Sequence, residues 1–420
     1  MNVAVIGSGG REHALCFKLS FSKKISKLFC IPGNPGTSLV SKNIEINYLD
    51  FSLLYSTLLE NDISIVIIGP EIPLVEGIVD FLSSKNIFAF GPSKKASQLE
   101  GSKTFMKKLC KDFNIPTAKY KNFDDFLKAE EFIKKSKHPI VIKSDGLAAG
   151  KGVVISSNEK ESVQFTKEIL DGKFKNSNKV VIEEFLEGEE ASYFVITDGQ
   201  NYLPLGTAQD HKRIGENDTG LNTGGMGAYS PSLLITDALQ EKINRKIIEP
   251  TINGLNAIGC TFVGILYAGL MIKDDEPKLI EYNIRFGDPE CQVLMMRLEN
   301  DLLDLILSIK NKRLQNEKIS WNKNPCITVV AAAKGYPEKY KSKTEIKNLE
   351  NIENNSTQQL FHAGTIKVNN RILANGGRVL NATTMASNLN DAREKAHSML
   401  DLVDWEDKYF RKDIGWRAIK

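Results

Sequence analysis

The sequence predicts a multidomain protein of mixed α/β and α+β class, and three observations support this prediction. The 420 residues exceed what one hydrophobic core usually serves. Short apolar strand-like stretches alternate with helix-like stretches over about the first hundred residues. The last hundred residues return largely to strand-like segments. We therefore expect an N-terminal doubly wound parallel sheet, a central domain and a β-rich C-terminal domain.

The N-terminal alternation predicts four strands and the helices between them. The expected strands cover 2–7, 27–33, 63–71 and 87–92, and the expected helices cover 12–20, 51–62 and 74–86. Ligands of such sheets bind at the carboxyl ends of the strands. Those ends are the Gly- and Pro-rich sequences GSGGRE, IPGNPGT, GPEIPLVEG and FGPS.

The rest of the chain predicts a central domain of paired strands and helices, followed by a C-terminal domain. Expected helices cover 103–113, 123–137, 236–258 and 291–312, and expected strands cover 264–272, 278–283, 326–333 and 359–370. The segment 209–231 is expected to be an irregular glycine-rich stretch, too long for a simple surface loop. We expect domains at 1–103, 104–312 (with a lid subdomain at about 120–190) and 325–420, with 311–325 as a linker.

Composition and charge exclude several classes of protein. The net charge of +3, from 55 Lys and Arg against 52 Asp and Glu, is too small to indicate nucleic acid or a membrane surface as a partner. No segment approaches the ~20 apolar residues of a membrane span. The cysteines form no C-x-x-C pair and are expected to be buried, reduced thiols of a cytoplasmic protein. They are Cys16, Cys30, Cys110, Cys260, Cys291 and Cys326.

The turn GSGGRE resembles a dinucleotide-binding loop only in part. Gly7 and Gly9 fit the G-x-G-x-x-G pattern, but Glu12 stands at the third glycine position. The second predicted strand ends in IPG and lacks the acidic residue that would bind the ribose hydroxyls. The sequence therefore disfavours a nicotinamide-dependent oxidoreductase.

The same turn still favours a phosphorylated ligand smaller than a dinucleotide. Gly9 and Gly10 expose backbone N–H groups at a helix N-terminus, and Arg11 adds a planar, permanently charged donor. A tight strand-to-helix turn without a ligand is the alternative interpretation.

The segment IVIKSDGLAAGKGVVI predicts a nucleotide site of another kind. Lys143 ends a strand, and Gly146, Gly150 and Gly152 form a loop that carries Lys151. A Walker P-loop would have Ser or Thr in place of Gly152. A loop between two strands can instead close over a triphosphate and exclude water. The alternative is a glycine-rich hairpin with exposed lysines.

Two later segments fit the same nucleotide site. Glu183 and Glu190 flank a short connection where a backbone edge could meet an adenine and a carboxylate could meet a ribose. Glu281 and Asn283 lie two residues apart on a predicted strand and so face the same side, beside Arg285. Two oxygen ligands on one face suit Mg²⁺ bridging phosphates, although a solvated strand edge also carries such residues. A loop that closes over the triphosphate, a connecting segment that meets the adenine, and an acid–amide pair for a metal ion are what phosphoryl transfer from ATP requires.

At this point the chain resembles the ATP-grasp enzymes and, among them, the phosphoribosylamine–glycine ligase family. The resemblance runs essentially end to end. It rests on GSGGREHAL, PGNPGT, GPEIPLVEG, LEGSKTFMK, KSDGLAAGKGVV, IEEFLEGEEAS, QDHKRIGENDTGLNTGGMGAYSP, EYNIRFGDPE, FHAGT, NGGRVL and RKDIGWRAI. It implies a central ATP-grasp domain with a mobile lid subdomain. It also implies that glycine, activated by ATP as glycyl phosphate, is joined to 5-phosphoribosylamine in purine synthesis.

The resemblance implies a role for each of the matching residues. ATP would contact Lys103, Lys143, Gly146, Gly150, Lys151, Gly152, Glu183, Glu184, Phe185, Leu186 and Glu190. Mg²⁺ or Mn²⁺ would bind Glu281 and Asn283, with no further acid on the preceding strand to hold a second ion. The catalytic residues would be Arg285, Lys143, Asp210 and His211, with His211 in a fixed hydrogen-bonding role.

The two remaining substrates would bind to the loops. Glycine and the intermediate would be enclosed by Lys212, Arg213, Asn222, Gly225 and Met226, with Arg285, Gly287 and Asp288 alongside. The sugar phosphate would lie near Gly9, Gly10, Arg11 and Glu12, with Gly33, Asn34, Pro70 and Glu71 around the sugar. Arg378 either reaches this site from the C-terminal domain or has a structural role.

One departure and three alternatives remain. Leu221 stands where the family pattern usually has proline, which predicts a looser loop. The alternatives are another ATP-grasp carboxylate–amine ligase, a nicotinamide-dependent oxidoreductase and a noncatalytic nucleotide-binding regulator. The presence of Lys143, Glu281, Asn283 and Arg285 together weighs against the regulator. We expect a monomer that acts on small molecules.

Overall fold

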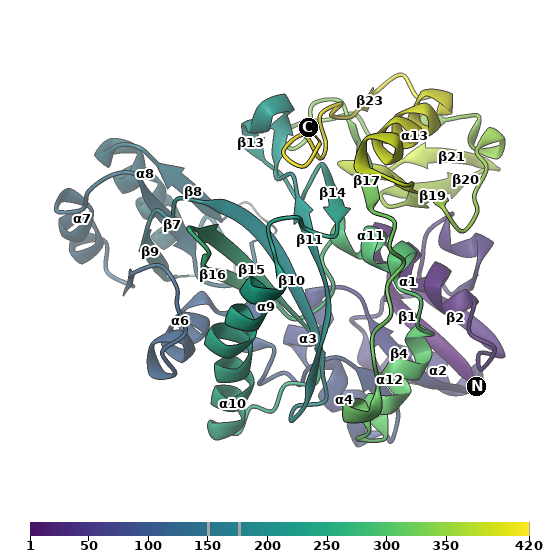
Figure 1. Ribbon diagram of the computed structural model, residues 1–420, viewed down its shortest axis with the longest axis horizontal. Coiled ribbons are helices and arrows are strands. Elements are labelled where there is room, and N and C mark those ends of the chain that lie inside the picture. Colours follow the sequence, from purple (N-terminus) through teal and green to yellow (C-terminus); the bar gives the residue numbers. More distant parts are fainter. Residues whose placement is uncertain (149–151, 175–177, 420) are drawn as a thin grey trace.

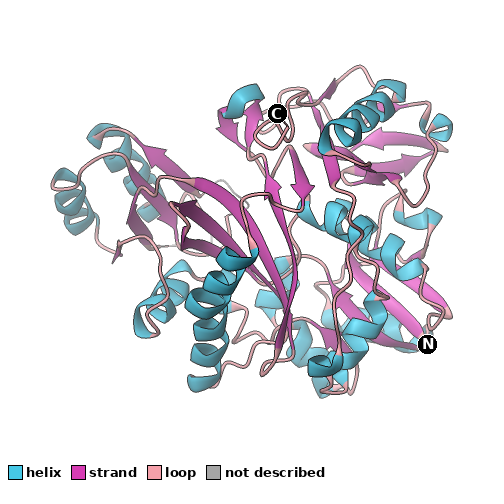
Figure 2. Ribbon diagram, in the orientation of Figure 1, coloured by secondary structure: helices cyan, strands magenta, loops and turns pink. Residues whose placement is uncertain are grey.

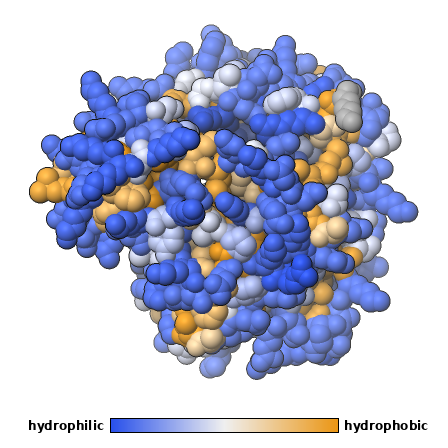
Figure 3. Space-filling model, turned by 60° about the vertical axis from the view of Figure 1, so that its left-hand side comes forward, coloured by the Kyte–Doolittle hydropathy of each residue, from blue (hydrophilic) through white to orange (hydrophobic). Residues whose placement is uncertain are grey.

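The computed structural model describes residues 1–148, 152–174 and 178–419. It confirms the mixed α/β class, with an N-terminal parallel sheet, a central part built on antiparallel sheets and helices, and C-terminal antiparallel sheets (Figures 1 and 2). Two predicted lid residues, Gly150 and Lys151, lie outside the described residues. The surface drawn in Figure 3 is largely hydrophilic, with apolar residues in small separate patches.

The N-terminal sheet is parallel, with strand order β3-β2-β1-β4-β5. Its strands are β1 (Asn2–Gly7), β2 (Lys27–Pro32), β3 (Lys42–Asn43), β4 (Ile63–Ile68) and β5 (Phe88–Phe90). The first helices are α1 (Gly10–Ser20), α2 (Phe51–Glu60), α3 (Glu71–Glu76) and α4 (Ile78–Ser84). The single helix expected at 74–86 was wrong, because Gly77 takes a left-handed φ of 97° and separates α3 from α4.

A four-stranded antiparallel sheet with order β6-β9-β7-β8 follows, after α5 (Gln98–Gly101) and α6 (Lys103–Asp112). Its elements are β6 (Tyr120–Phe123), α7 (Phe126–Lys134), β7 (Ile140–Ser144), β8 (Val153–Ser156), α8 (Glu159–Leu170) and β9 (Val180–Glu184). It has its own small core, which includes Phe123, Ile142 and Ile182, and lies at one side of the molecule (Figure 1). The predicted pair of strands around the glycine-rich loop is present, with Lys143 opposite Val153.

The largest sheet spans the central and C-terminal parts of the chain. Its order is β16-β15-β10-β11-β14-β17-β22-β19, and β23 (Lys408–Tyr409) pairs with β17. The strands are β10 (Glu189–Thr197), β11 (Tyr202–Asp210), β14 (Gly227–Ser230), β15 (Gly264–Lys273), β16 (Glu276–Asn283), β17 (Cys326–Ala333), β19 (Gln358–His362) and β22 (Arg378–Met385). Pairing of β14 with β17 makes the two parts one continuous sheet, which local sequence patterns do not reveal.

The stretch 209–231 is more regular than its glycine content predicts. It contains the end of β11, a hairpin of β12 (Arg213–Gly215) and β13 (Thr219–Asn222) joined by η2 (Glu216–Asp218), and then β14. Asn217 and Asp218 both have positive φ, of 53° and 55°, which Asn and Asp tolerate better than most residues. The prediction of a wholly irregular segment was therefore wrong.

The remaining helices surround these sheets. They are α9 (Asp237–Ile243), the π-helix η3 (Asn244–Ile248), α10 (Glu249–Ala257), α11 (Glu290–Arg297), α12 (Leu302–Lys310) and α13 (Leu389–Leu402). The single helix predicted at 291–312 is divided because Leu298 is extended and bridges Trp321, after which Asp301 caps α12. Short 3-10 turns η1 (Thr37–Leu39), η4 (Leu314–Asn316) and η5 (Leu349–Asn351) and a small sheet of β18 (Thr344–Ile346), β20 (Thr365–Val368) and β21 (Arg371–Ala374) complete the described fold.

Packing of α1 against α11 joins the N-terminal sheet to the large sheet. Leu15 and Leu19 share a buried cluster with Val293 and Leu294, which brings the glycine-rich turn before α1 next to the start of α11. All six cysteines are buried and unpaired. None of the described helices combines the length and apolar character that a membrane span requires.

Candidate active site

Arg285 lies just beyond β16 and is held by carboxylates from two earlier segments. Its Nε contacts Glu71 Oε2 at 3.1 Å, and its Nη2 contacts Glu100 Oε1 at 2.7 Å. Its Nη1 donates to the carbonyl of Phe286 at 3.2 Å. Glu100 also accepts the backbone N–H of Ile284 at 2.8 Å, which ties α5 to the end of β16. Any substrate oxyanion that reaches Arg285 must share or displace these partners.

The two carboxylates beside Arg285 differ in their electrostatics. Burial raises the pKa of Glu100 to about 7, and Arg285 only partly offsets that effect. Burial also opposes ionisation of Glu71, but Arg285 and Arg11 outweigh it and lower the pKa of Glu71. Sequence reasoning predicted Glu71 and missed Glu100, whose signal was an acidic residue directly before the GSK sequence.

A buried chain of charges connects Lys143 on β7 to Lys107 on α6. Glu183 on β9 contacts Lys143 Nζ through Oε2 at 3.0 Å and Lys107 Nζ through Oε1 at 3.2 Å. Lys107 also donates to Thr117 Oγ1 at 2.8 Å. The Glu183 side chain therefore faces two lysines, while the adenine role predicted for 183–186 rests mainly on backbone groups. Lys107 was missed; its signal was a lysine on the apolar face of α6, beside Met106 and Cys110.

Lys103, at the start of α6, reaches the loop after β7. Its Nζ donates to the carbonyl of Gly146 at 3.1 Å, and Asp145 accepts the backbone N–H of Thr104 at 3.1 Å. The loop closes at its other end where Ser144 N–H donates to Gly152 O at 2.8 Å. Burial lowers the pKa of Lys103, so this lysine gains from an anionic partner.

Glu281 and Asn283 lie on β16, two residues apart, opposite Gly269 and Tyr267 of β15. Burial opposes ionisation of Glu281, but Lys212, Lys143 and Lys103 together lower its pKa. A carboxylate and a carboxamide are oxygen donors of the kind that a hard divalent cation prefers, with phosphates and water as further ligands. Within the described residues, no three His, Cys, Asp or Glu side chains are grouped so as to hold a metal. The pair therefore suits a cation that is shared with a phosphorylated substrate.

Lys212 is surrounded by acidic groups at the end of β11. Its Nζ contacts Glu190 Oε2 at 2.6 Å. Burial opposes the charge of Lys212, yet Glu190 and Asp210 raise its pKa well above the ordinary value. Burial raises the pKa of Asp210 to about 7, with Lys212 opposing and Glu290 and Glu190 adding to the rise. The carboxylate predicted to contact ribose, Glu190, is thus bonded to a predicted glycine-site lysine.

His211 is buried and follows Asp210. Burial lowers its pKa to about 4, so the ring is neutral near pH 7. Its Nε2 accepts the backbone N–H of Gly415 at 2.6 Å, and Nδ1 has no hydrogen-bond partner in the described part of the chain. The backbone of 211–227 folds on itself, because Met226 N–H donates to His211 O and Thr223 N–H donates to Lys212 O. The neighbouring predicted residues Arg213 and Asn222 face each other in the β12–β13 hairpin.

The glycine-rich turn before α1 already has carboxylate partners. Gly9 N–H donates to Glu12 Oε2 at 2.6 Å, and Arg11 Nε contacts Glu12 Oε1 at 2.7 Å. The backbone N–H of Arg11 points to Asp288 Oδ2 at 3.4 Å. A side chain at Gly10 would meet Asn381 Nδ2 at 2.5 Å and Gln292 Nε2 at 2.6 Å, so close packing accounts for this glycine. The sugar-phosphate site at this turn stays a prediction.

The other residues predicted around the sugar have mainly structural contacts. The Asn34 carboxamide donates to Ser8 O at 2.8 Å and to His362 O at 2.9 Å, which ties β1 and β2 to β19. Gly33 has a φ of 76°, and Pro70 precedes the first turn of α3. A side chain at Gly287 would meet the carboxylate of Glu290.

Arg378 links the C-terminal part to two predicted substrate segments. Its Nη1 donates to Gly224 O at 2.7 Å and to Asp288 O at 2.6 Å. It therefore borders the site, and these contacts are with main-chain carbonyls.

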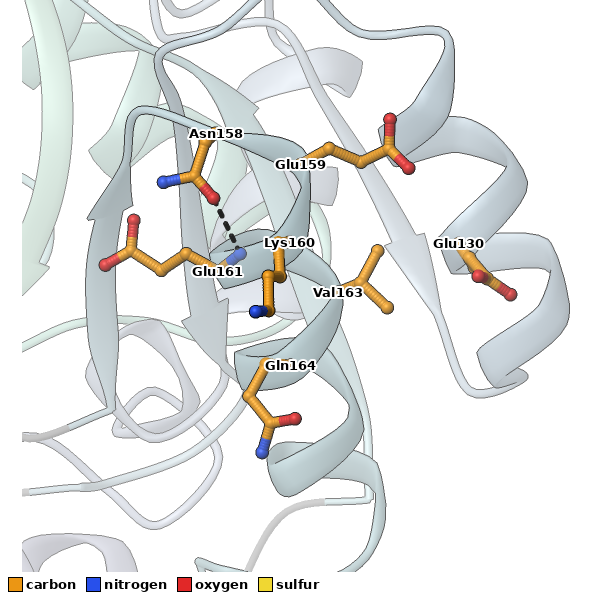
Figure 4. Close-up of a pocket in the computed structure, with 7 residues that line it drawn as sticks. All are labelled: Glu130, Asn158, Glu159, Lys160, Glu161, Val163 and Gln164. Atoms are coloured by element: carbon orange, nitrogen blue, oxygen red, sulfur yellow. Dashed lines mark hydrogen bonds between the residues drawn. The ribbon is translucent and has the colours of Figure 1, made fainter.

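A pocket between α7 and α8, drawn in Figure 4, is lined by none of the residues that the sequence predicted for the site. It is lined by Glu130, Asn158, Glu159, Lys160, Glu161, Val163 and Gln164.

Comparison with known proteins gives the same family along the whole chain. Residues 1–100, 101–291 and 326–417 match the N domain, the ATP-grasp (A) domain and the C domain of phosphoribosylglycinamide synthetase. The phosphoribosylamine–glycine ligase of Brucella melitensis is 49% identical over 100% of this chain and 99% of its own length. The chloroplastic enzyme of the same name from Arabidopsis thaliana is 48% identical over 98% of this chain and 79% of its own.

Solved structures agree with this assignment. The phosphoribosylamine–glycine ligase of Thermotoga maritima has a TM-score of 0.84 and 31% identity, over 99% of this chain and 100% of that one. The biotin carboxylase domain of Hydrogenobacter thermophilus 2-oxoglutarate carboxylase, at 18% identity and a TM-score of 0.76, shares the fold. It covers 97% of this chain and 91% of its own. This chain belongs to the phosphoribosylamine–glycine ligase family of ATP-grasp enzymes.

Proposed function

We propose that this protein joins glycine to 5-phosphoribosylamine and converts ATP to ADP and phosphate, giving glycinamide ribonucleotide for purine synthesis. Family membership over the full length supports the reaction. The observation that carries the proposal is the setting of Glu281, a half-buried carboxylate. Against the opposing effect of desolvation, its pKa is lowered by the charges of Lys212, Lys143, Lys103 and Arg285, which come from separate segments. Such a concentration of cations around one carboxylate suits a polyphosphate bound with a divalent cation.

The proposed reaction has two chemical steps. A carboxylate oxygen of glycine attacks the γ-phosphorus of ATP, the bond to the β–γ bridging oxygen breaks, and ADP leaves. The product, glycyl phosphate, has a good leaving group where free glycine has none. The amine of 5-phosphoribosylamine then attacks the acyl carbon, phosphate departs with the bonding electrons, and the new amide nitrogen loses a proton. Closure of the site is needed because an acyl phosphate reacts readily with water.

In the proposal, different residues bind the ATP phosphates, hold the divalent cation and stabilise the charge that develops during transfer. Lys103 and Lys143 bind the ATP phosphates, and the ion pair with Glu183 orients Lys143. Glu281 and Asn283 would hold Mg²⁺ or Mn²⁺, which neutralises phosphate charge when it is bound. Arg285 stabilises the charge that develops on the transferring phosphoryl group and on the acyl phosphate.

The proposal also includes the compartment, the oligomeric state and the partners of the enzyme. We place it in the cytoplasm as a monomer that acts on ATP, glycine and 5-phosphoribosylamine, without nucleic acid or membrane. The near-balanced net charge of +3 argues against a nucleic-acid or membrane partner, and the six buried, unpaired cysteines fit a reducing compartment.

Release of ADP with omission of one substrate at a time tests the proposed function. With Mg²⁺ and ATP present, we expect release only when both glycine and freshly generated 5-phosphoribosylamine are added. Release that depends on formate or bicarbonate instead would leave the ATP-grasp assignment standing and overturn the substrate assignment. Absence of any substrate-dependent release would contradict the ligase function.

A further inference from the structure

The C-terminal segment 409–417 packs against the β12–β13 hairpin, about two hundred residues earlier in the chain (Figure 1). Arg411 is its centre and is fully buried. Its guanidinium binds Asp413 in a bidentate pair, with both contacts at 2.8 Å. Its Nη1 donates to Asp218 Oδ1 and to the carbonyl of Arg213, both at 2.9 Å. Arg411 therefore connects the tip and the base of the hairpin.

Other contacts from the same segment fix the hairpin backbone. Asp413 Oδ2 accepts the N–H of Asn217 at 2.7 Å, and Arg417 contacts Asp218 Oδ2 at 2.8 Å. Asn217 and Asp218 are the two residues with left-handed φ at the turn. Consecutive left-handed residues persist where the surrounding structure holds them, and here the holding groups come from the C-terminal segment.

The segment also sets the protonation pattern of His211. The N–H of Gly415 can only donate, so Nε2 of His211 must accept and the proton of the neutral ring lies on Nδ1. The Nδ1–H has no acceptor within the described residues. A buried donor without a partner is uncommon in folded proteins, and a ligand oxygen is one group that satisfies it.

Packing completes the connection between the segment and the predicted glycine loop. Ile414 is fully buried in one apolar cluster with Met226. A side chain at Gly227 would meet Ile414 Cγ2 at 2.8 Å. Tyr409 donates its hydroxyl proton to the carbonyl of Ile214 at 2.9 Å. The loop 211–227 is thus held at both ends and at its tip by the last part of the chain.

We propose that the segment 409–417 is a clamp that holds the β12–β13 hairpin and His211 for binding of the amino-acid substrate, with Arg411 as its positioning residue. The proposal rests on the proposed function, because it assumes that loop 211–227 encloses glycine. Arg411 bonds Asp413, Asp218 and the main chain of Arg213, and so it acts through the loop. The ATP phosphate residues lie on other elements, so loss of the clamp should affect glycine more than ATP.

The test compares Arg411→Met and Arg411→Lys with Arg371→Met, an exposed arginine of the C-terminal part. In steady-state assays, Arg411→Met should raise the KM for glycine about tenfold or more and leave the KM for ATP within about twofold. Arg411→Lys keeps the charge but loses the bidentate fork, so its effect should be intermediate. Arg371→Met should match the wild type.

A second measurement reports the clamp without any turnover. Hydrogen exchange of peptides from 211–225 in the ligand-free protein should be faster in Arg411→Met than in wild type or Arg371→Met. A spectrum of ¹⁵N-histidine protein, assigned with a His211→Gln variant, should show the Nδ1–H tautomer of His211 in wild type and its loss in Arg411→Met. If Arg411→Met does not fold, Asp413→Asn removes one charge of the same pair with little change of shape.

The outcomes separate the two proposals. Faster exchange together with a selective rise in the KM for glycine supports the clamp. Unchanged exchange, or faster exchange with equal changes in the KM for glycine and ATP, overturns the positioning role. Lack of glycine-dependent ADP release by the wild type itself would overturn the proposed function, and with it the glycine role of the clamp.

Discussion

Arg285, which is expected to contact a phosphoryl group, is held in place by two carboxylates and a main-chain carbonyl. Glu71 and Glu100 reach it from different segments, and all three of its side-chain nitrogens have partners. Sequence reasoning could predict this arginine from its place after E-x-N. It could not predict the Glu100 contact, which depends on how α5 packs near the end of β16.

Replacement of Arg285 by alanine should reduce turnover by about a hundredfold or more while ATP still binds. The physical reason is loss of charge stabilisation where the phosphoryl group transfers. Turnover and ATP binding by equilibrium titration are the two measurements, with Arg371→Ala as control. Near-normal turnover would remove Arg285 from the chemistry.

Replacement of Lys107 by methionine should destabilise the protein by about 3 kcal/mol, because it leaves half of a buried carboxylate unpaired. Lys107 is fully buried and forms an ion pair with Glu183, whereas the Lys108 side chain is 72% exposed. Lys108→Met is therefore the matched control and should stay within about 0.5 kcal/mol of wild type. Chemical denaturation measures both values. Equal stability of the two variants would show that Lys143 alone satisfies Glu183.

At the scale of elements, packing at the start of α1 determines which groups the N–H donors of the GSGGRE motif bind. The sequence GSGGRE predicted free N–H groups for a phosphate, but Glu12 turns back onto Gly9 and Asp288 faces Arg11. Gly10 is needed because side chains from α11 and β22 lie against it. A phosphate at this helix N-terminus would replace carboxylates that are already present.

Replacement of Gly10 by alanine should destabilise the protein by about 1–3 kcal/mol through overpacking. The new Cβ would lie about 2.5 Å from Asn381 Nδ2 and 2.6 Å from Gln292 Nε2. Gly269→Ala is the control, since its Cβ would make contacts no closer than 3.5 Å. Thermal unfolding of both variants tests this, and the prediction fails if Gly10→Ala is as stable as Gly269→Ala.

At the scale of the whole molecule, the N-terminal and C-terminal parts meet through buried histidines. His362 N–H donates to His13 Nδ1 at 2.9 Å, and both rings are neutral because burial lowers their pKa values. For His362 the pKa falls to about 4 from 6.5. The folded form therefore binds fewer protons than the unfolded form between these values. The stability that the neutral His362 ring contributes is present above pH 6.5 and is lost as pH falls toward 4.

Replacement of His362 by glutamine should make the loss of stability between pH 6.5 and 4.5 shallower than in wild type. Glu100 and Asp210 act in the opposite direction, since their raised pKa values favour the folded form at lower pH, so the comparison must be between variants. Denaturation at several pH values gives the slopes, with His138→Gln as control. Parallel curves for wild type and His362→Gln would contradict the assignment.

The sequence by itself determined the class of each part, the strands that carry Lys143 and Glu281, and the family, because these depend on periodicity and on motifs read along the chain. The breaks at Gly77 and Leu298 were missed, since a helical period does not show where a turn becomes left-handed or a residue becomes extended. Only the tertiary structure decided the pairing of β14 with β17, the partners of Arg285 and Glu183, and the contact of Arg411 with the hairpin. These contacts join residues tens to hundreds of positions apart. Burial and distance in the folded chain, which no local pattern encodes, determine which charges meet.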